Sequence, residues 1–119
     1  EFLKVCEFLR DDSRCKFEMM MDLTAVDRLE QGLKPRFEVV YHFKSLSLGK
    51  RLRLKVHLEE KDSNIDSIHH LWKAVNWYER ECYDMYGIIF NNHPDLRRIL
   101  MYDQYINLFH LQYPLLQNY

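Results

Sequence analysis

The chain has 119 residues, of which 47% are hydrophobic, and its 17 lysine and arginine residues nearly balance its 18 aspartate and glutamate residues. This length and hydrophobic content support one domain with one core, while the balanced charge provides no global field that would attract nucleic acid or an anionic membrane. No apolar run approaches the roughly 20 residues that a membrane-spanning helix needs, and three widely spaced cysteines favour a reducing compartment over a disulfide framework.

The first predicted elements are a helix and a strand. Apolar residues at helical spacing predict a helix over residues 2–9. Because the sequence starts inside this pattern, we expect an N-terminally truncated or processed chain, and no signal or transit peptide is visible. Strict alternation predicts a strand over 16–23, followed by a connection over 24–33. One face of that strand would carry Phe17, Met19, Met21 and Leu23.

Two further strands are predicted over 36–44 and 50–59, joined by a hairpin connection over 45–49. Both alternate between apolar and polar residues, so each has one face toward the core. The outward face of the second carries Arg51, Arg53, Lys55 and His57.

The C-terminal half is predicted to be mainly helical. Asp66 is expected to cap a short helix over 66–72, and a longer helix over 75–86 would stop at Gly87. By spacing, the buried face of the longer helix would carry Val75, Tyr78, Cys82 and Met85. A short strand follows over 88–90, and then a turn from Asp95 to Leu100. This order predicts an α+β fold, a meander of about three strands plus a short strand, covered by helices on one side.

The stretch from Trp77 to Leu100 concentrates charged and aromatic residues: WYERECYDMYGIIFNNHPDLRRIL. This half of the chain contains neither a CxxC nor an HExxH motif. Adjacent histidines on a helix point in directions too different to bind one metal ion. We therefore predict no metal-binding residue. The residue types considered as ligands are His69, His70, Glu79, Cys82 and His93.

Acid–base catalysis is an alternative role for Glu79, Glu81 and Asp84, because the last two share a helix face at a spacing of three. No nucleophile accompanies them in a recognisable order. Acidic residues beside arginines usually form ion-pair networks, so we predict no catalytic and no cofactor-binding residue. A free-standing acid–base enzyme remains the alternative from another functional class.

Nucleic-acid binding through Arg51, Arg53 and Lys55 is a further alternative. Sheets that bind RNA usually expose aromatic residues on the binding face, and this face has none. The basic face is therefore predicted to be solvated or to face a partner.

The charges of the Trp77–Leu100 stretch are best explained as braces between two segments. The planar guanidinium group of arginine suits bidentate pairing with carboxylates, and Pro94 holds His93 extended. Such pairs would fix a helix, a turn and an interface. The predicted structural and interface residues are Glu79, Arg80, Glu81, Asp84, Gly87, His93, Pro94, Asp95, Arg97 and Arg98.

At these residues the sequence resembles the thirty-kilodalton subunit of respiratory complex I, which is known as the C subunit of NADH:quinone oxidoreductase and as the J subunit in cyanobacterial and plastid forms. The hallmark of that family is an ERE triplet, an acidic and aromatic segment, and HPDLRR. Here these stand at 79–81, 83–87 and 93–98. Upstream, DLTAVD at 22–27 and RFEVVY at 36–41 also resemble the family.

The resemblance covers about residues 2–105 and implies a non-catalytic structural subunit. Such a subunit belongs to the peripheral arm of a proton-pumping complex and clasps the forty-nine-kilodalton subunit that lines the quinone site. The resemblance implies a two-layer domain with an extended C-terminal segment and no cofactor in this chain, since NADH, FMN, iron–sulfur clusters and quinone are bound by partner subunits. The complex lies on the cytoplasmic face of the bacterial inner membrane, or the matrix face in mitochondria, so the chain would meet the membrane only through the complex.

The tail departs from the family pattern. Where the family continues with a glycine, a second His-Pro and a basic segment, this chain has a different sequence after Tyr105, so we expect a family domain over 1–105 and a divergent tail over 106–119. Membrane-bound nickel–iron hydrogenases and formate hydrogenlyase use the same domain. An equivalent role in such an assembly is the second alternative.

Overall fold

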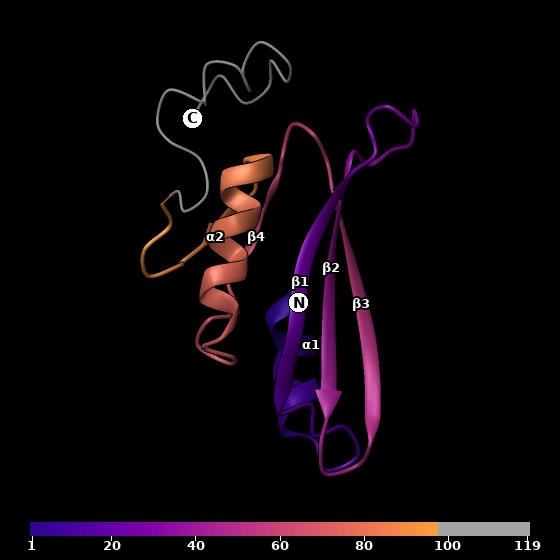
Figure 1. The fold of residues 1–119 in the computed structure, drawn as a ribbon, viewed down its shortest axis with the longest axis vertical. Helices are drawn as coiled ribbons and strands as arrows, with labels where there is room; N and C mark the ends of the chain where they lie inside the picture. Colours follow the sequence, from indigo (N-terminus) through magenta and orange to yellow (C-terminus); the bar gives the residue numbers. More distant parts are fainter. Residues whose placement is uncertain (98–119) are drawn as a thin grey trace.

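The structure is a computed structural model that describes residues 1–97 (Figure 1). Predictions for Arg98, for the turn as far as Leu100, for the extended C-terminal segment and for the tail over 106–119 lie outside these residues. The elements in chain order are α1 (Phe2–Asp11), β1 (Met19–Asp27), β2 (Phe37–Ser45), β3 (Lys50–Leu58), β4 (Asn64–Asp66), α2 (Val75–Tyr86) and β5 (Ile89–Asn91).

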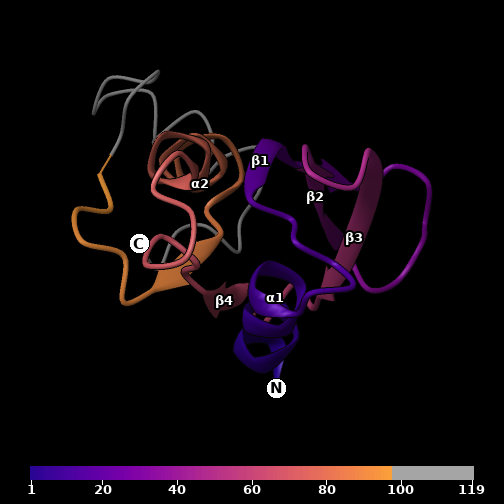
Figure 2. The ribbon, with the colours of Figure 1, turned by 90° about the horizontal axis from the view of Figure 1, so that it is seen from below.

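The strands form two separate sheets. An antiparallel meander has the order β1-β2-β3, and a small parallel sheet pairs β4 with β5. Figure 2 shows α1, α2 and the small sheet on one side of the meander, while its other face is not covered by any described helix or strand. The predicted α+β fold is therefore confirmed. Within residues 1–97, neither helix has the length and apolar content that crossing a membrane would require.

The core lies between the meander and the helices. The inward face of β2 carries large side chains, and the rings of Tyr41 and Phe43 stack with centroids 6.1 Å apart. Trp72 packs on Phe43 at 4.7 Å and donates its indole N–H to the carbonyl of Phe17 at 2.9 Å. The alternation predicted for β2 and β3 is confirmed, because the exposed positions of β3 are the basic ones.

The predicted bounds of the first strand are wrong, and its predicted core face is correct for Phe17 and Leu23 but wrong for Met19 and Met21. β1 runs to Asp27, and its pairing with β2 shifts register between Met20 and Asp22. Met20 and Leu23 are buried, whereas Met19 and Met21 are each 41% exposed. A β-bulge adds one residue to one strand, so the alternation on either side of it points to opposite faces. The alternation in the sequence gives no sign of this bulge, so it could not predict the change of face.

The short helix predicted over 66–72 is also absent from the described structure. Asn64–Asp66 instead forms β4 in parallel register with β5. The chain then makes a single turn, in which the amides of Leu71 and Trp72 both donate to the carbonyl of Ile68. The backbone of Asp66 is engaged in a strand, so it does not begin a helix.

The longer helix is confirmed with the predicted bounds. α2 ends at Gly87, whose φ of 73° is the left-handed conformation that glycine adopts readily. The predicted buried face is only partly correct, because Tyr78 and Met85 are half-buried and Glu79 is buried instead. That carboxylate is the central feature of the site.

Candidate functional site

Glu79 is the first glutamate of the ERE triplet and is completely enclosed, with 0% exposure. Its Oε1 accepts a hydrogen bond from the hydroxyl of Ser67 at 2.6 Å, and its Oε2 accepts one from the backbone N–H of Ile68 at 3.0 Å. The hydroxyl oxygen of Ser67 in turn accepts the amide of His69 at 3.2 Å. The Glu79 side chain on α2 therefore accepts hydrogen bonds from the turn that follows β4 and joins that turn to the helix.

Burial raises the pKa of Glu79 to about 7, although the hydrogen bonds from Ser67 and Ile68 oppose this effect. The same buried region holds Tyr41, whose pKa is raised by burial and then by the negative charge of Glu79. Its hydroxyl group has no hydrogen-bond partner among the described residues. The carboxyl group thus lies in an apolar interior where protonation near neutral pH is favourable.

His93 encloses the other side of this carboxyl group. Its Nε2 donates to the carbonyl of Asn76 at 3.2 Å, and its Nδ1 accepts the amide of Asp95 at 3.0 Å. These two bonds define a neutral ring with the proton on Nε2. Burial lowers the pKa of His93, which favours the same neutral form. Its Nε2 lies 3.8 Å from Oε1 of Glu79, so the contact is one between a carboxyl group and an uncharged ring.

The other motif residues lie around this centre on the surface of α2 and in the segment after β5. The Nε of Arg80 donates to the carbonyl of Arg97 at 3.2 Å, and its guanidinium group lies 5.9 Å from the ring of Trp77, which is 52% exposed. Arg97 pairs with Asp95 at 2.8 Å on the surface. Arg80 therefore connects α2 to the chain that leaves the domain.

The remaining predicted positions are not gathered around a common centre. Glu81 and Asp84 are half-buried on α2, and Pro94 is exposed. Glu81 forms no ion pair with any residue in the described range. The predicted bracing role of this set, with Gly87 at the end of the helix, stays a prediction.

Of the ligand types considered for a metal, His69, Glu79 and His93 lie near one another, but they do not form a metal-binding group. No group of three histidine, cysteine or acidic residues within residues 1–97 has the geometry to hold an ion. The rings of His69 and His93 are 6.2 Å apart, His70 is exposed, and burial raises the pKa of the Cys82 thiol. Glu79 has no exposed surface, so it cannot reach a dissolved substrate as an acid or base.

A second buried ionic cluster was not predicted. Arg36 is 5% exposed and donates from Nε and Nη2 to the two carboxylate oxygens of Asp27, both at 2.9 Å, and from Nη1 to Glu60 at 2.6 Å. Its guanidinium group also lies 4.8 Å from the Phe37 ring. Asp27 and Arg36 belong to the DLTAVD and RFEVVY segments, which were the available signal for this pair.

The raised pKa of Glu79 predicts a pH-dependent stability. Unfolded glutamate releases its proton near pH 4.5, whereas folded Glu79 retains it to about pH 7, so the folded state binds more protons between these values. The contribution of Glu79 is full below pH 4.5 and is lost as pH rises through 7, on the order of 3 kcal/mol in total. Denaturant unfolding of the native protein and of Glu79→Gln across this range should show that loss only in the native protein. Parallel curves would contradict it.

The whole sequence is similar to known proteins. Residues 1–119 match the model of the family described as "Respiratory-chain NADH dehydrogenase, 30 Kd subunit". The chain is 50% identical over 94 residues to the NADH-quinone oxidoreductase C subunit of Cereibacter sphaeroides, which is 79% of this chain and 46% of that protein. It is 51% identical over 104 residues to the corresponding C subunit of Citrifermentans bemidjiense, covering 87% of this chain and 62% of that protein. The chain thus spans about half the length of these curated relatives, or somewhat more.

Two solved structures share the fold. A trypsin-resistant fragment of Nqo5 superposes with a TM-score of 0.70 and 30% identity, covering 80% of this chain and 74% of that one. A chain of the membrane-bound sulfane sulfur reductase, an archaeal respiratory membrane complex, superposes with a TM-score of 0.60 and 19% identity, covering 95% of this chain and 76% of that one. The second likeness shows the fold alone.

Proposed function

The chain belongs to the family of the 30-kilodalton subunit of respiratory-chain NADH dehydrogenase, and from this membership we propose that it is a structural subunit of the peripheral arm of a proton-pumping NADH:quinone oxidoreductase. In this role it supports electron transfer from NADH to quinone by holding the forty-nine-kilodalton subunit at the quinone site. It contributes no catalytic residue of its own.

One observation carries the proposal: the characteristic ERE glutamate is enclosed and used for internal attachment. Glu79 ties α2 to the turn at Ser67 and Ile68, while the next residue, Arg80, faces outward beside Trp77. Exposed tryptophan and arginine are the residue types that most often anchor protein interfaces. This arrangement supports a rigid helix that presents an interface, with the partner surface at Trp77 and Arg80.

The proposal includes the absence of a cofactor in this chain and the presence of flavin, iron–sulfur clusters and quinone in its partners. The chain then meets the inner membrane only through the assembled complex, on its cytoplasmic or matrix side. In the full-length protein isolated alone, iron and flavin are expected at far below one per chain, by metal analysis and absorbance. Stoichiometric iron with an EPR signal after reduction would contradict this part of the proposal.

A second candidate is the equivalent position in another respiratory membrane assembly. The fold match to the archaeal sulfane sulfur reductase supports this second candidate, because one fold can serve in two different complexes. Identity of about half to the two bacterial relatives favours the NADH:quinone oxidoreductase. Tagged full-length protein purified from its own membranes should bring down an NADH-oxidising, quinone-reducing complex. Recovery with a nickel–iron hydrogenase or a sulfur reductase would select the second candidate.

Replacing Arg80 with alanine should weaken assembly, because the variant removes both the bond to the Arg97 carbonyl and the cation beside Trp77. We expect the amount of assembled complex on native gels to fall about fivefold. Arg14→Ala is the matched control, since Arg14 is an exposed arginine whose side-chain contacts, with Asp12 and the Phe8 ring, are both local. Equal amounts of complex for the two variants would contradict the interface at α2.

A further inference from the structure

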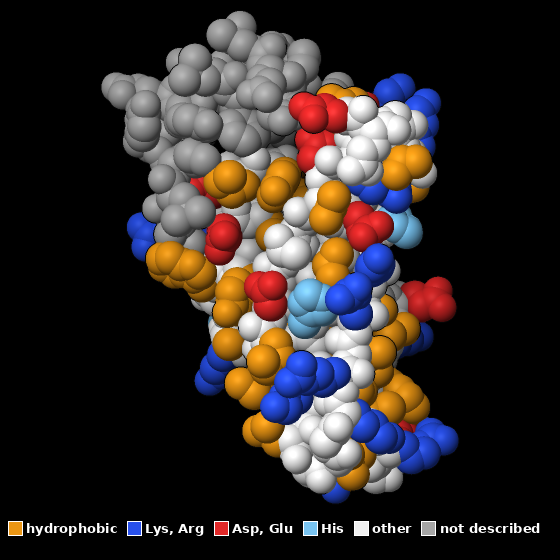
Figure 3. Space-filling view, turned by 45° about the vertical axis from the view of Figure 1, so that its right-hand side comes forward, with side chains coloured by type: hydrophobic (Ala, Val, Ile, Leu, Met, Phe, Trp, Pro, Cys, Tyr) orange, Lys and Arg blue, Asp and Glu red, His pale blue; other side chains and the backbone are white. Residues whose placement is uncertain are grey.

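The uncovered face of the meander is a second surface with a distinct character (Figure 3). The pairing register places Lys44 opposite Arg51 and His42 opposite Arg53, with Asp22 beside His42 on β1. Lysine and arginine side chains therefore gather on this face, although the whole chain has one more acidic than basic residue. These basic residues take no part in the hydrogen bonds of Glu79 or in the surface of α2 around Trp77 and Arg80.

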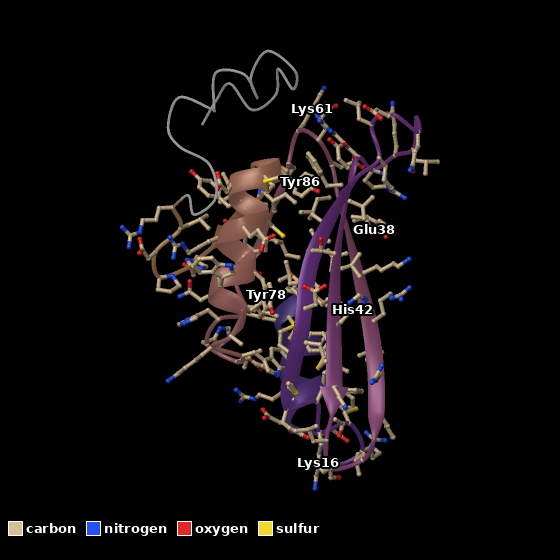
Figure 4. The ribbon with its side chains drawn as sticks, viewed as in Figure 1. Lys16, Glu38, His42, Lys61, Tyr78 and Tyr86 are labelled. Carbon is tan, nitrogen blue, oxygen red and sulfur yellow. The ribbon has the colours of Figure 1, made fainter. Side chains whose placement is uncertain are left out.

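The two halves of this face differ in how their charges are compensated. In one half, Glu38 lies within 3.1 Å of His57, 3.5 Å of Lys55 and 3.7 Å of Arg28. In the other half, Lys44, Arg51 and Arg53 form no ion pair with any carboxylate in residues 1–97. Figure 4 shows Glu38 and His42, the central residues of the two halves, at different heights along β2. The uncompensated half is the one that surrounds His42.

A groove of about 630 Å³ crosses this half, lined by Met21, Asp22, His42, Phe43, Arg51, Leu52 and Arg53. Nε of Arg53 donates to Nε2 of His42 at 3.1 Å, so the ring proton lies on Nδ1, which is 3.9 Å from Asp22. This contact uses only Nε of Arg53, and within residues 1–97 its two terminal nitrogens make no hydrogen bond or ion pair with a carboxylate. The arrangement presents a fork that suits a carboxylate.

The β-bulge of β1 adds an apolar contact to the same groove. The register shift at this point leaves Met21 on the outside of the sheet, 41% exposed, at the edge of the groove. Methionine adapts its shape to a partner surface, and arginine is enriched at interfaces. Charges on an edge strand such as β3 also discourage aggregation, but that role does not require an exposed methionine or like charges directly opposite at Lys44 and Arg51.

We propose that this groove docks an acidic segment of a neighbouring subunit, whose carboxylates pair with Arg51 and Arg53 while an apolar side chain of that segment contacts Met21. The proposal rests on the proposed function, because it requires a multi-subunit complex around the chain. Pairing with carboxylates would also remove the repulsion between Lys44 and Arg51 that the isolated face retains. Nucleic acid is the less favoured occupant, since the groove contains a carboxylate and no exposed aromatic ring.

The first arm of the test reverses the charge of the groove in the full-length protein. Arg51→Glu/Arg53→Glu should lower recovery of the assembled complex about tenfold at ~0.15 M salt. Lys4→Glu/Lys61→Glu makes the same charge change at exposed positions elsewhere and should leave recovery unchanged. Arg51→Lys/Arg53→Lys keeps the charge but not the guanidinium fork, so we expect recovery between that of the native protein and that of the charge-reversed variant. Equal recovery for the two charge-reversed variants would overturn the proposal.

The second arm identifies the occupant without disturbing the charges. Met21 is replaced by the photo-reactive amino acid benzoylphenylalanine in the full-length protein, and the purified complex is irradiated. The expected product links Met21's position to a segment of another subunit that contains aspartate or glutamate residues. A normally assembled complex without such a link, or a link to nucleic acid, would overturn the groove proposal alone. Absence of the chain from any NADH:quinone oxidoreductase would instead overturn the proposed function, and the groove proposal with it.

Discussion

Replacing Glu79 with alanine is expected to lower the free energy of unfolding by about 3 kcal/mol. The variant leaves the Ile68 amide and the Ser67 hydroxyl buried without their acceptor and creates a cavity in a region of zero exposure. Removing a partly ionised buried carboxyl group recovers some desolvation energy, but two unsatisfied donors and a void outweigh that gain. Denaturant unfolding followed by the fluorescence of buried Trp72 measures the change.

The matched control is Glu81→Ala on the same helix. Glu81 is half-buried and has no ion pair among the described residues, so its replacement should change stability by less than about 0.5 kcal/mol. Glu79→Gln keeps the shape and one acceptor oxygen, and we expect a loss between the two. Equal stability for the Glu79→Ala and Glu81→Ala variants would show that the buried hydrogen bonds of Glu79 do not hold α2 in place.

Arg36→Ala is expected to cost about 3 kcal/mol, because it removes the cation that Asp27 and Glu60 share. Burial alone would raise the pKa of Asp27, yet the hydrogen bonds from Arg36 hold it below its ordinary value. Asp27 is mostly covered, while Glu60 can turn toward water. The expected loss of stability is therefore at the lower end of the range for breaking a buried ion pair. The loss should be smaller in acid, where protonation of Asp27 removes its unpaired charge.

Arg10→Ala is the control for this variant, because Arg10 pairs with the adjacent Asp11 on the surface. Its effect should stay within about 0.5 kcal/mol. Arg36→Lys separates charge from geometry, since a lysine cannot form the bidentate pair with Asp27, and we expect an intermediate loss. If Arg36→Ala and Arg10→Ala are equally mild, the cluster between β1, β2 and the turn at Glu60 contributes no net stability.

The sequence pattern predicted those parts of the fold that depend on residues close together in the chain. The helix at Val75–Tyr86 and its glycine stop follow from 3.6-residue spacing and from the left-handed preference of Gly87. β2 and β3 follow from strict alternation joined by a short hairpin. Each of these features depends on residues that are close in the sequence.

The parts that were missed depend on contacts between distant residues. A charged residue such as Glu79 is assigned to the exposed face by pattern, and its burial depends on hydrogen bonds from Ser67 and Ile68, twelve and eleven residues away. The strand at Asn64–Asp66 exists through its parallel pairing with Ile89–Asn91, which no local period encodes. At Met21 a single extra residue reverses the face of the strand. In each case a tertiary contact outweighed the local preference.

The family motif therefore divides into an interior half and an exterior half. The carboxyl group of Glu79 meets the neutral ring of His93 in the core, whereas Arg80 and Trp77 lie at the surface of the same helix. The charges of this stretch are compatible with catalysis by residue type, and their geometry instead supports attachment. In the proposed complex, variants of the interior half would act through the stability of the domain and variants of the exterior half through assembly.

The most direct test of a structural role is the quinone-reductase turnover per assembled complex in membranes that carry the full-length protein. Glu79→Ala and Arg80→Ala are compared with the native protein, with complex quantified on native gels and NADH:quinone turnover measured on the same samples. We predict that the amount of complex falls in both variants while turnover per complex is unchanged. A normal amount of complex with lost turnover would contradict the account, because it would place these residues in the chemistry of electron transfer.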